Sequence, residues 1–270
     1  MPKHGSVSPV VTDAIFELAE GVIWDDRAGL VRGVDIWEGR ILAGQLDDSR
    51  IVVCSVIRIS QSAGAVALAE DEGFLVAASR GLATISPTGA VSIGPDLLGD
   101  RSGSRLNDGS VDPQGRFIVG TLSHTGKAAR DLGVEQLLRV SPDGRVEKLR
   151  DSLRRSNGIG FSPSGDEIYH VDTFARTASS HSYGPGAFDT DEPWVTVLDE
   201  PDLPAHPDGL TVDSTGALWV AHWGLSSVRR HAVNGGEVAR HRHCRRDTGA
   251  VPRLRGRDGD ARWPCHHLCP

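Results

Sequence analysis

The chain has 270 residues, of which 39% are hydrophobic and 24% are charged, and its formal net charge is −7. This length can bury one large core or two small ones, and the negative charge argues against nucleic acid or an anionic membrane as the main partner. No run of about 18 apolar residues predicts a membrane span, and the first twenty residues do not resemble a secretory signal.

The four cysteines are distributed unevenly along the chain. Cys54 stands alone, whereas Cys244, Cys265 and Cys269 lie near the end. This arrangement is not the framework of a small disulfide-rich protein, so we expect a reducing, cytoplasmic environment.

Turn signals divide most of the chain into short strands. The 32 glycines and 15 prolines alternate with short β-branched runs, and helical periodicity is weak. One series of turns contains a glycine at intervals of 44, 42, 50 and 51 residues: Gly29, Gly73, Gly115, Gly165 and Gly216. A second series lies between them, at Gly89, Gly144 and Gly235. Two hairpins per period give four strands per unit, which is typical of propeller blades.

The period also predicts the number of blades. At about 45 residues per blade, the chain has room for six, although only five inner hairpins are recognisable and the sixth is expected near residues 250–265. We therefore predict an all-β fold, a six-bladed β-propeller with four-stranded antiparallel blades in which the last blade is degraded or missing. The propeller is expected over residues 14–230, followed by an atypical tail over 231–270.

Three inner hairpins begin with the same kind of residue. The segments "NDGSVDPQG" from Asn107, "NGIGFSPSG" from Asn157 and "DGLTVDSTG" from Asp208 each open eight residues before their turn glycine. Ala65 takes this position in the second hairpin, and in the first Glu20 lies one residue before it. Because innermost strands begin at the same mouth of a propeller channel, we expect Glu20, Asn107, Asn157 and Asp208 to converge.

Such a group of oxygen donors predicts a cation site. Two carboxylates and two amides at a narrow mouth repel one another or remain unsatisfied without a cation. An all-oxygen set favours Ca²⁺, Mg²⁺ or Mn²⁺. The alternative is that Asn-Gly and Asp-Gly only form turns; their shared register argues against it.

The same segments resemble those of a known family. "AEGVIWDDRAGLVRGVDI", "SRLNDGSVDPQGRF", "SNGIGFSPSGDEIYHVD" and "HPDGLTVDSTGALWVAHWG" look like the SMP-30/gluconolactonase (regucalcin-like) family of six-bladed propellers. The resemblance runs from about Leu18 to Arg230. It implies one divalent cation (calcium, with magnesium, manganese or zinc as alternatives) and hydrolysis of sugar lactones or related esters.

The resemblance also implies roles for individual residues. Glu20, Asn157 and Asp208 match the metal-binding positions, and Arg105 and Asn107 match the pair that holds the substrate's oxygens. The metal would polarise the lactone carbonyl, and Asp208 would activate the attacking water. The alternative for Arg105 is a salt bridge with Asp108.

His124 follows the third inner hairpin near the expected mouth, where we expect it to contact substrate. The alternative is a structural or solvated histidine.

The tail breaks the pattern. Residues 229–270 contain ten arginines, no lysine and three cysteines, without apolar alternation. Our hypothesis is that roughly the last 35 residues come from a shifted reading frame or another foreign ending; an intact frame in the coding DNA, with no hidden propeller-like extension, would refute the shift. A zinc site of the tail's Cys and His residues is the weaker alternative, because their spacing matches no ordinary zinc finger.

The leading functional prediction is a metal-dependent lactonase acting on a small sugar-type lactone. The alternatives are a non-catalytic calcium- or partner-binding propeller, since fold alone does not specify chemistry, and a metal-dependent esterase of the same fold. The sequence does not indicate the oligomeric state.

Overall fold

A computed structural model gives the structure of the protein and describes residues 3–7, 12, 14–47, 50–59, 61–123, 133–233 and 236–243. Strands, turns and bends make up this part of the chain, in which no residue is helical. Within it, no helix has the length and apolar character needed to cross a membrane.

Apart from β1, the strands form five antiparallel blades of four, one after another along the chain, which we call blades 1 to 5. Blade 1 contains β2 (Ala19–Asp25), β3 (Leu30–Asp35), β4 (Arg40–Asp47) and β5 (Arg50–Arg58). Blade 2 contains β6 (Ala63–Leu68), β7 (Phe74–Ala78), β8 (Gly81–Ile85) and β9 (Val91–Asp96). Blade 3 contains β10 (Ser104–Val111), β11 (Phe117–Ser123), β12 (Glu135–Val140) and β13 (Val146–Leu153). Blade 4 contains β14 (Ser156–Phe161), β15 (Glu167–Asp172), β16 (Thr177–Ser182) and β17 (Val195–Asp199). Blade 5 contains β18 (His206–Val212), β19 (Leu218–Trp223), β20 (Ser227–His231) and β21 (Glu237–His243).

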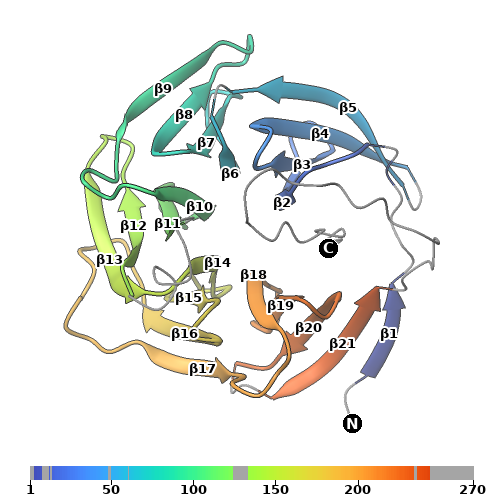
Figure 1. Ribbon diagram of the computed structural model, residues 1–270, viewed down its shortest axis with the longest axis vertical. Helices are drawn as coiled ribbons and strands as arrows, with labels where there is room; N and C mark the ends of the chain where they lie inside the picture. Colours follow the sequence, from blue (N-terminus) through green and yellow to red (C-terminus); the bar gives the residue numbers. More distant parts are fainter. Residues whose placement is uncertain are drawn as a thin grey trace.

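The blades are arranged around a central axis (Figure 1). The first strand of each blade (β2, β6, β10, β14 and β18) is innermost, and the fourth strand lies at the rim. The propeller architecture and the four-stranded blades predicted from the turn spacing are therefore confirmed.

The predicted number of blades is wrong: the described residues form five blades rather than six. Blade 5 ends at His243, beyond the predicted boundary at residue 230. Residues 244–270 lie outside the described part of the chain. The turn expected near residues 250–265 and the hypothesis about the tail fall in this segment and stay predictions. The prediction of six blades was wrong because it used the chain length. A sufficient length permits a sixth blade, but strands form only where apolar residues alternate with polar ones.

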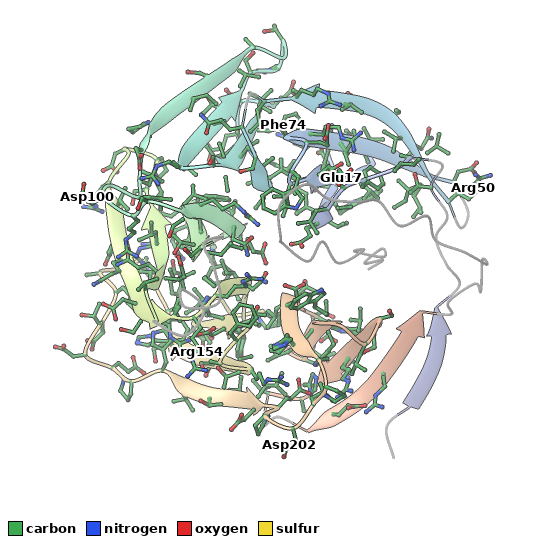
Figure 2. All side chains as sticks on the ribbon, viewed as in Figure 1. Glu17, Arg50, Phe74, Asp100, Arg154 and Asp202 are labelled. Carbon is green, nitrogen blue, oxygen red and sulfur yellow. The ribbon has the colours of Figure 1, made fainter. Side chains whose placement is uncertain are left out.

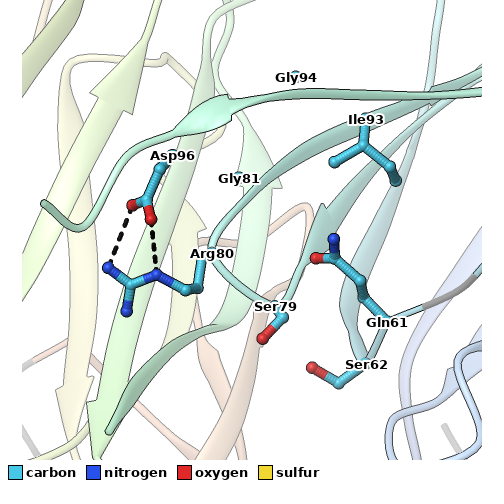
Figure 3. Close-up of a pocket in the computed structure, with 8 residues that line it drawn as sticks. All are labelled: Gln61, Ser62, Ser79, Arg80, Gly81, Ile93, Gly94 and Asp96. Atoms are coloured by element: carbon cyan, nitrogen blue, oxygen red, sulfur yellow. Dashed lines mark hydrogen bonds and ion pairs between the residues drawn. The ribbon is translucent and has the colours of Figure 1, made fainter. Parts of the chain in front are cut away.

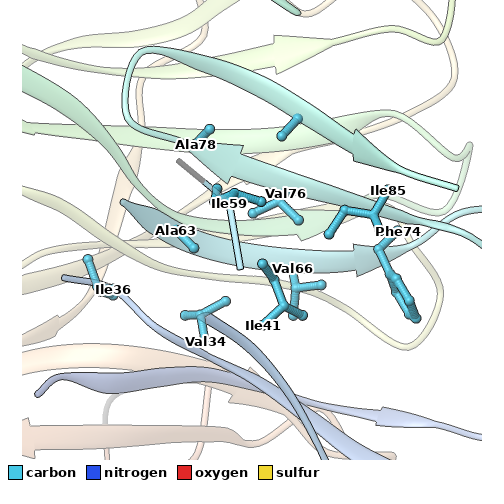
Figure 4. Close-up of a cluster of buried hydrophobic side chains, with 11 residues drawn as sticks. Val34, Ile36, Ile41, Ile59, Ala63, Val66, Phe74, Val76, Ala78 and Ile85 are labelled. Atoms are coloured by element: carbon cyan, nitrogen blue, oxygen red, sulfur yellow. The ribbon is translucent and has the colours of Figure 1, made fainter. Parts of the chain in front are cut away.

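Apolar side chains fill each interface between consecutive blades, and Figure 2 shows side chains occupying these spaces. Between blades 1 and 2, for example, Val34 and Ile41 pack against Val66, Val76 and neighbouring residues (Figure 4). Similar clusters join blades 2 and 3, blades 3 and 4, and blades 4 and 5. The short β-branched runs of the sequence thus supply the core between the blades.

The other side of blade 1 is different. Val22 and Trp24 on β2 are 46% and 55% exposed, while Ile23 between them packs into the cluster shared with blade 2. Side chains alternate between the two faces of a strand, so Val22 and Trp24 belong to the face turned away from blade 2. This apolar face has no neighbouring blade among the described residues.

An additional strand, β1 (Lys3–Val7), pairs in parallel with the rim strand β21. Its register places Lys3 opposite Ala239 and Val7 opposite His243. β1 thus covers the hydrogen-bonding edge of blade 5, an edge that would otherwise be open to association. The turn pattern did not predict this strand.

Candidate functional site

All five innermost strands contain the same local irregularity. The ladder with the second strand shifts between Glu20 and Ile23, Ala63 and Val66, Leu106 and Gly109, Ser156 and Ile159, and Pro207 and Leu210. A β-bulge re-aims the side chains of its unpaired residues. The bulges therefore place Asn107, Asn157 and Asp208 at equivalent positions of blades 3, 4 and 5, as the sequence predicts.

Blades 1 and 2 have glycines, not Asn or Asp, at the bulge position that Asn107, Asn157 and Asp208 take in the other blades. Gly21 takes the equivalent position in blade 1, with Glu20 one residue before it, as expected. In blade 2 the bulge contains Gly64 and Ala65, and the residue with the positive φ of the turn is Glu72 (65°). Gly64, eight residues before Glu72, therefore takes the position that the glycine spacing gave to Ala65. Neither residue offers a side-chain donor.

Hydrogen bonds connect the polar residues of blades 3, 4 and 5. The Asn157 Nδ2 group donates to Asp208 Oδ1 and, at 3.2 Å, to Thr173 Oγ1. The Asn107 Nδ2 group donates to the carbonyl oxygen of Ser156 at 3.0 Å. Asn157 Oδ1 is buried and has no hydrogen-bond partner among the described residues. The structure thus brings Asn107, Asn157 and Asp208 together and leaves one amide oxygen unsatisfied.

Arg105 is the buried cation of the site, with 3% of its surface exposed. Its Nη1 group donates to the Leu106 carbonyl and to Asn107 Oδ1, both at 2.8 Å, and its guanidinium lies 5.2 Å from the centre of the Trp37 ring. Burial lowers its pKa to about 10, against the attraction of Glu20. Within the described residues these contacts replace the alternative salt bridge with Asp108.

Three carboxyl groups face this centre: Glu20, Asp108 and Asp208. Burial raises the pKa of Glu20, and repulsion by Asp208 and Asp108 raises it further. Burial also raises the pKa of Asp108, to about 7, and that of Asp208. These interactions place Glu20 of blade 1 within electrostatic range of blades 3 and 5.

Two further charged residues belong to this site: Arg155 was not predicted from the sequence, and Asp108 was considered only as a salt-bridge partner of Arg105. Asp108 lies in the bulge beside Asn107 and accepts a hydrogen bond from the Gly109 amide at 2.8 Å. Arg155 attracts both Glu20 and Asp208, and its guanidinium lies 4.4 Å from the centre of the Phe174 ring. A signal for both was available, since each lies one or two residues from a predicted site residue.

Two glycines allow the innermost strands to approach closely. A Cβ atom on Gly158 would lie 2.6 Å from the Asp208 carbonyl oxygen, and one on Gly64 would lie 2.4 Å from the Asn107 carbonyl oxygen. By contrast, a Cβ on Gly209 would meet no atom within 4 Å. The spacing of the polar groups therefore depends on Gly64 and Gly158.

The donors fit a hard divalent cation. Burial raises the pKa of all three carboxyl groups, repulsion by Asp208 adds to the shifts of Glu20 and Asp108, and the buried Asn157 amide oxygen lacks a donor among the described residues. An ion bound by oxygen atoms would offset this repulsion and satisfy Asn157 Oδ1. Glu20, Asn157 and Asp208 are the residues present that could hold it.

Two other locations bear on the site. His124 lies outside the described residues, so its expected contact with substrate stays a prediction. A pocket of about 540 Å³ lies beside β8 and β9, where Arg80 pairs with Asp96 at 2.6 Å (Figure 3). None of the predicted site residues lines this pocket. It is therefore separate from the polar centre.

Comparison with known proteins gives a match over most of the chain. Residues 18–249 match the family described as SMP-30/Gluconolactonase/LRE-like region. The chain belongs to this family. The resemblance predicted from the sequence motifs is thereby confirmed.

Other members of the family have been named for their activities. The chain is 30% identical to a pentonolactonase of Haloferax volcanii, over 85% of this chain and 75% of that protein. It is 31% identical to a 6-deoxy-6-sulfogluconolactonase of Pseudomonas putida, over 81% of this chain and 72% of that protein. The crystal structure of regucalcin from Agrobacterium tumefaciens, a calcium-binding protein, is similar with a TM-score of 0.75 and 25% identity, covering 88% of this chain and 80% of that one.

Proposed function

We propose that this protein is a divalent-cation-dependent hydrolase that opens a small sugar-type lactone. The observation that carries the proposal is the meeting of Glu20, Asn157 and Asp208 with Arg105 and Asn107 at the bulges of the innermost strands. The pentonolactonase and sulfogluconolactonase among its relatives support this class of substrate.

Glu20, Asn157 and Asp208 would hold the cation, whose charge would polarise the lactone carbonyl and stabilise the developing oxyanion. Asp208 would take a proton from the attacking water, and its partial burial makes the carboxylate a stronger base. Water adds to the carbonyl carbon, the ring C–O bond breaks, and the proton passes to the former ring oxygen. The product is the open-chain hydroxy acid.

Arg105 would bind and orient the substrate. Its guanidinium is fixed by Asn107 Oδ1, the Leu106 carbonyl and the Trp37 ring, whereas its Nε group is buried and has no hydrogen-bond partner in the part of the chain that the structure describes. A fixed guanidinium with an unused N–H is suited to a hydroxyl or carbonyl oxygen of a polar ligand. This favours a polyhydroxylated lactone over the more apolar ester considered above.

A calcium-binding propeller without turnover is the second candidate, and the similarity to a calcium-binding regucalcin favours it. The same oxygen donors serve either function. The two differ in whether Asp208 and Arg105 act on a substrate, which binding measurements alone do not reveal.

Acid release from gluconolactone by the purified chain would separate the two candidates. We expect turnover that stops with a chelator, returns with added Ca²⁺, Mg²⁺, Mn²⁺ or Zn²⁺, and is lost in Asp208→Asn. Asp143→Asn, in an exposed turn, is the matched control and should retain activity. Tight metal binding without turnover on a panel of lactones would favour the binding protein instead.

A further inference from the structure

A second group of metal-ligating side chains lies between blades 4 and 5. Glu200 follows β17, His222 is on β19, and His231 ends β20; we call these three residues the interblade triad. One potential ligand atom from each lies within 4.8 Å of the others, and both histidines are 2% exposed. The triad shares no residue with the site proposed above.

The hydrogen bonds of His222 indicate that a proton or a metal ion is needed between its ring and Glu200. Its Nδ1 atom lies 3.1 Å from the carbonyl oxygen of Val220, which can only accept, so Nδ1 carries a proton. In the neutral ring, Nε2 then presents a lone pair to Glu200 Oε2 at 2.7 Å. Two acceptors at this distance require a proton or a metal ion at the pair. A backbone carbonyl that binds the other ring nitrogen is also the usual support of a metal-ligating histidine.

His231 distinguishes a metal from a proton. Neither of its ring nitrogens has a hydrogen-bond partner among the described residues, although the ring is buried and its centre lies 6.0 Å from that of His222. A proton between His222 and Glu200 would satisfy that pair but leave His231 unsatisfied. A metal ion bound by all three side chains would satisfy His231 as well.

The surrounding charges are compatible with an ion at Glu200 Oε2. Arg229 Nη1 lies 3.4 Å from the other carboxylate oxygen, Oε1, and 3.4 Å from Glu237 Oε2. The Arg229 charge therefore acts on the opposite oxygen of Glu200 and is shared with a second carboxylate, which also binds Arg240. Partners of this kind orient a ligating carboxylate.

From this geometry we propose that the interblade triad binds a transition-metal ion of the Zn²⁺ class, which joins the end of blade 4 to the two middle strands of blade 5. Two imidazoles and one carboxylate are ligands that zinc prefers and calcium does not. Bonds of roughly 2.0–2.2 Å in a tetrahedral site require ligand atoms about 3.3 Å apart. Small side-chain rotations would bring the three atoms to this spacing.

The test is metal binding by the full chain after removal of bound metal and saturation with Ca²⁺. We expect wild-type protein to bind one Zn²⁺ through the triad, to give the visible spectrum of a four-coordinate site with Co²⁺, and to unfold at higher temperature with Zn²⁺. His231→Gln and His222→Gln should each weaken this binding by roughly a hundredfold or more, since even supporting residues of metal sites contribute 10–100-fold. His181→Asn is the matched control, because both ring nitrogens of that buried histidine already face backbone carbonyls.

Equal Zn²⁺ binding by wild type and both triad variants would overturn the proposal, as would the absence of Zn²⁺ binding by calcium-saturated wild type. If the glutamine variants do not fold, His231→Cys, which retains a ligand, should bind Zn²⁺.

Anomalous diffraction at the zinc edge from wild-type crystals gives an answer without any variant. A peak among Glu200, His222 and His231 supports the site, whereas a peak only beside Asp208 refutes it. Because the triad excludes Asp208, loss of lactonase activity and loss of this binding remain separate results.

Discussion

The polar site at the bulges and the interblade triad both include residues of blade 5, Asp208 on β18 and His222 on the neighbouring β19, but they differ in their donors and in their access to solvent. Glu20 and Asp208 are partly exposed, and the residues proposed to hold the cation there, Glu20, Asn157 and Asp208, offer oxygen atoms. In the triad, two of three donors are imidazole nitrogens, and the rings are buried. Both sites collect residues that are distant in sequence. Bringing distant residues together therefore does not by itself define the kind of site. The type of ligand atom and the exposure to solvent distinguish a site for a reacting substrate from a closed site for an ion.

The largest effect is expected for Asp208→Asn. The proposed general base would be lost while the shape of the side chain is kept, and general-base catalysis contributes about 10²–10⁴-fold. Measured rates of lactone hydrolysis should fall by this factor, with Asp143→Asn as control. A variant with more than half of wild-type activity would remove Asp208 from the mechanism.

Gly158→Ala tests whether strand spacing supports the bulge site. The new Cβ would lie 2.6 Å from the Asp208 carbonyl oxygen, so blades 4 and 5 must separate. We expect a destabilisation of about 1–3 kcal/mol, measured by urea unfolding, together with weaker binding of the divalent cation. Gly209→Ala is the matched control, because its Cβ would meet open space. Similar effects of the two substitutions would contradict the role given to close strand approach.

Glu200→Gln probes the triad in the chelated protein. Glu200 is 11% exposed in its side chain and contacts both His222 and Arg229. Removal of its charge should lower the free energy of unfolding by about 1–3 kcal/mol. Glu38→Gln breaks the exposed pair with Arg58 at 3.2 Å and should cost at most about 1 kcal/mol. Equal losses would mean that burial does not strengthen the interactions of the triad.

Acid should destabilise the native protein through His170, which contacts Ser156 beside the bulge of blade 4. His170 Nε2 lies 2.7 Å from Ser156 Oγ, and Arg150 donates to His170 Nδ1 at 3.2 Å. Burial and the charge of Arg150 lower the pKa of His170 well below its ordinary value. The unfolded chain therefore binds a proton near pH 6.5 that the native protein does not. The contribution of His170 to stability should therefore fall below that pH, by up to about 1.4 kcal/mol per pH unit for one proton. The raised pKa values of Glu20, Asp108 and Asp208 act in the opposite direction, because there the native protein binds protons that the unfolded chain does not.

Urea unfolding at several pH values between 5 and 8 measures this slope, and His170→Asn should reduce it by one proton's contribution. A variant with the wild-type slope would show that other groups cause the acid sensitivity.

The sequence predicted the regular part of the molecule and missed what depends on distant segments. The eight-residue spacing before Gly115, Gly165 and Gly216 correctly aligned Asn107, Asn157 and Asp208, because each hairpin repeats the same local structure. In blade 2 the same rule was wrong by one residue, since Glu72 adopts the positive φ there and Gly73 does not.

Contacts between residues of different blades were harder to predict from the sequence. Asp108 and Arg155 lie close in sequence to predicted site residues, but their electrostatic interactions with Glu20 of blade 1 cannot be predicted from that proximity alone. Glu200 follows β17, whereas His222 and His231 lie on β19 and β20, and the spacing of the three residues matches no metal-binding motif. The number of blades was wrong because it depended on chain length and on the family expectation rather than on strands that could be recognised.

The pairing of β1 with β21 has a consequence for how the molecule forms. Residues 3–7 meet residues 239–243, so this ladder closes a loop that contains the whole propeller. Contacts between residues this far apart form late, because the chain entropy lost in bringing them together must be offset by structure already made. The outer edge of blade 5 is therefore expected to be the last sheet edge to be covered, and during synthesis β1 has no partner strand until residues 237–243 have been made.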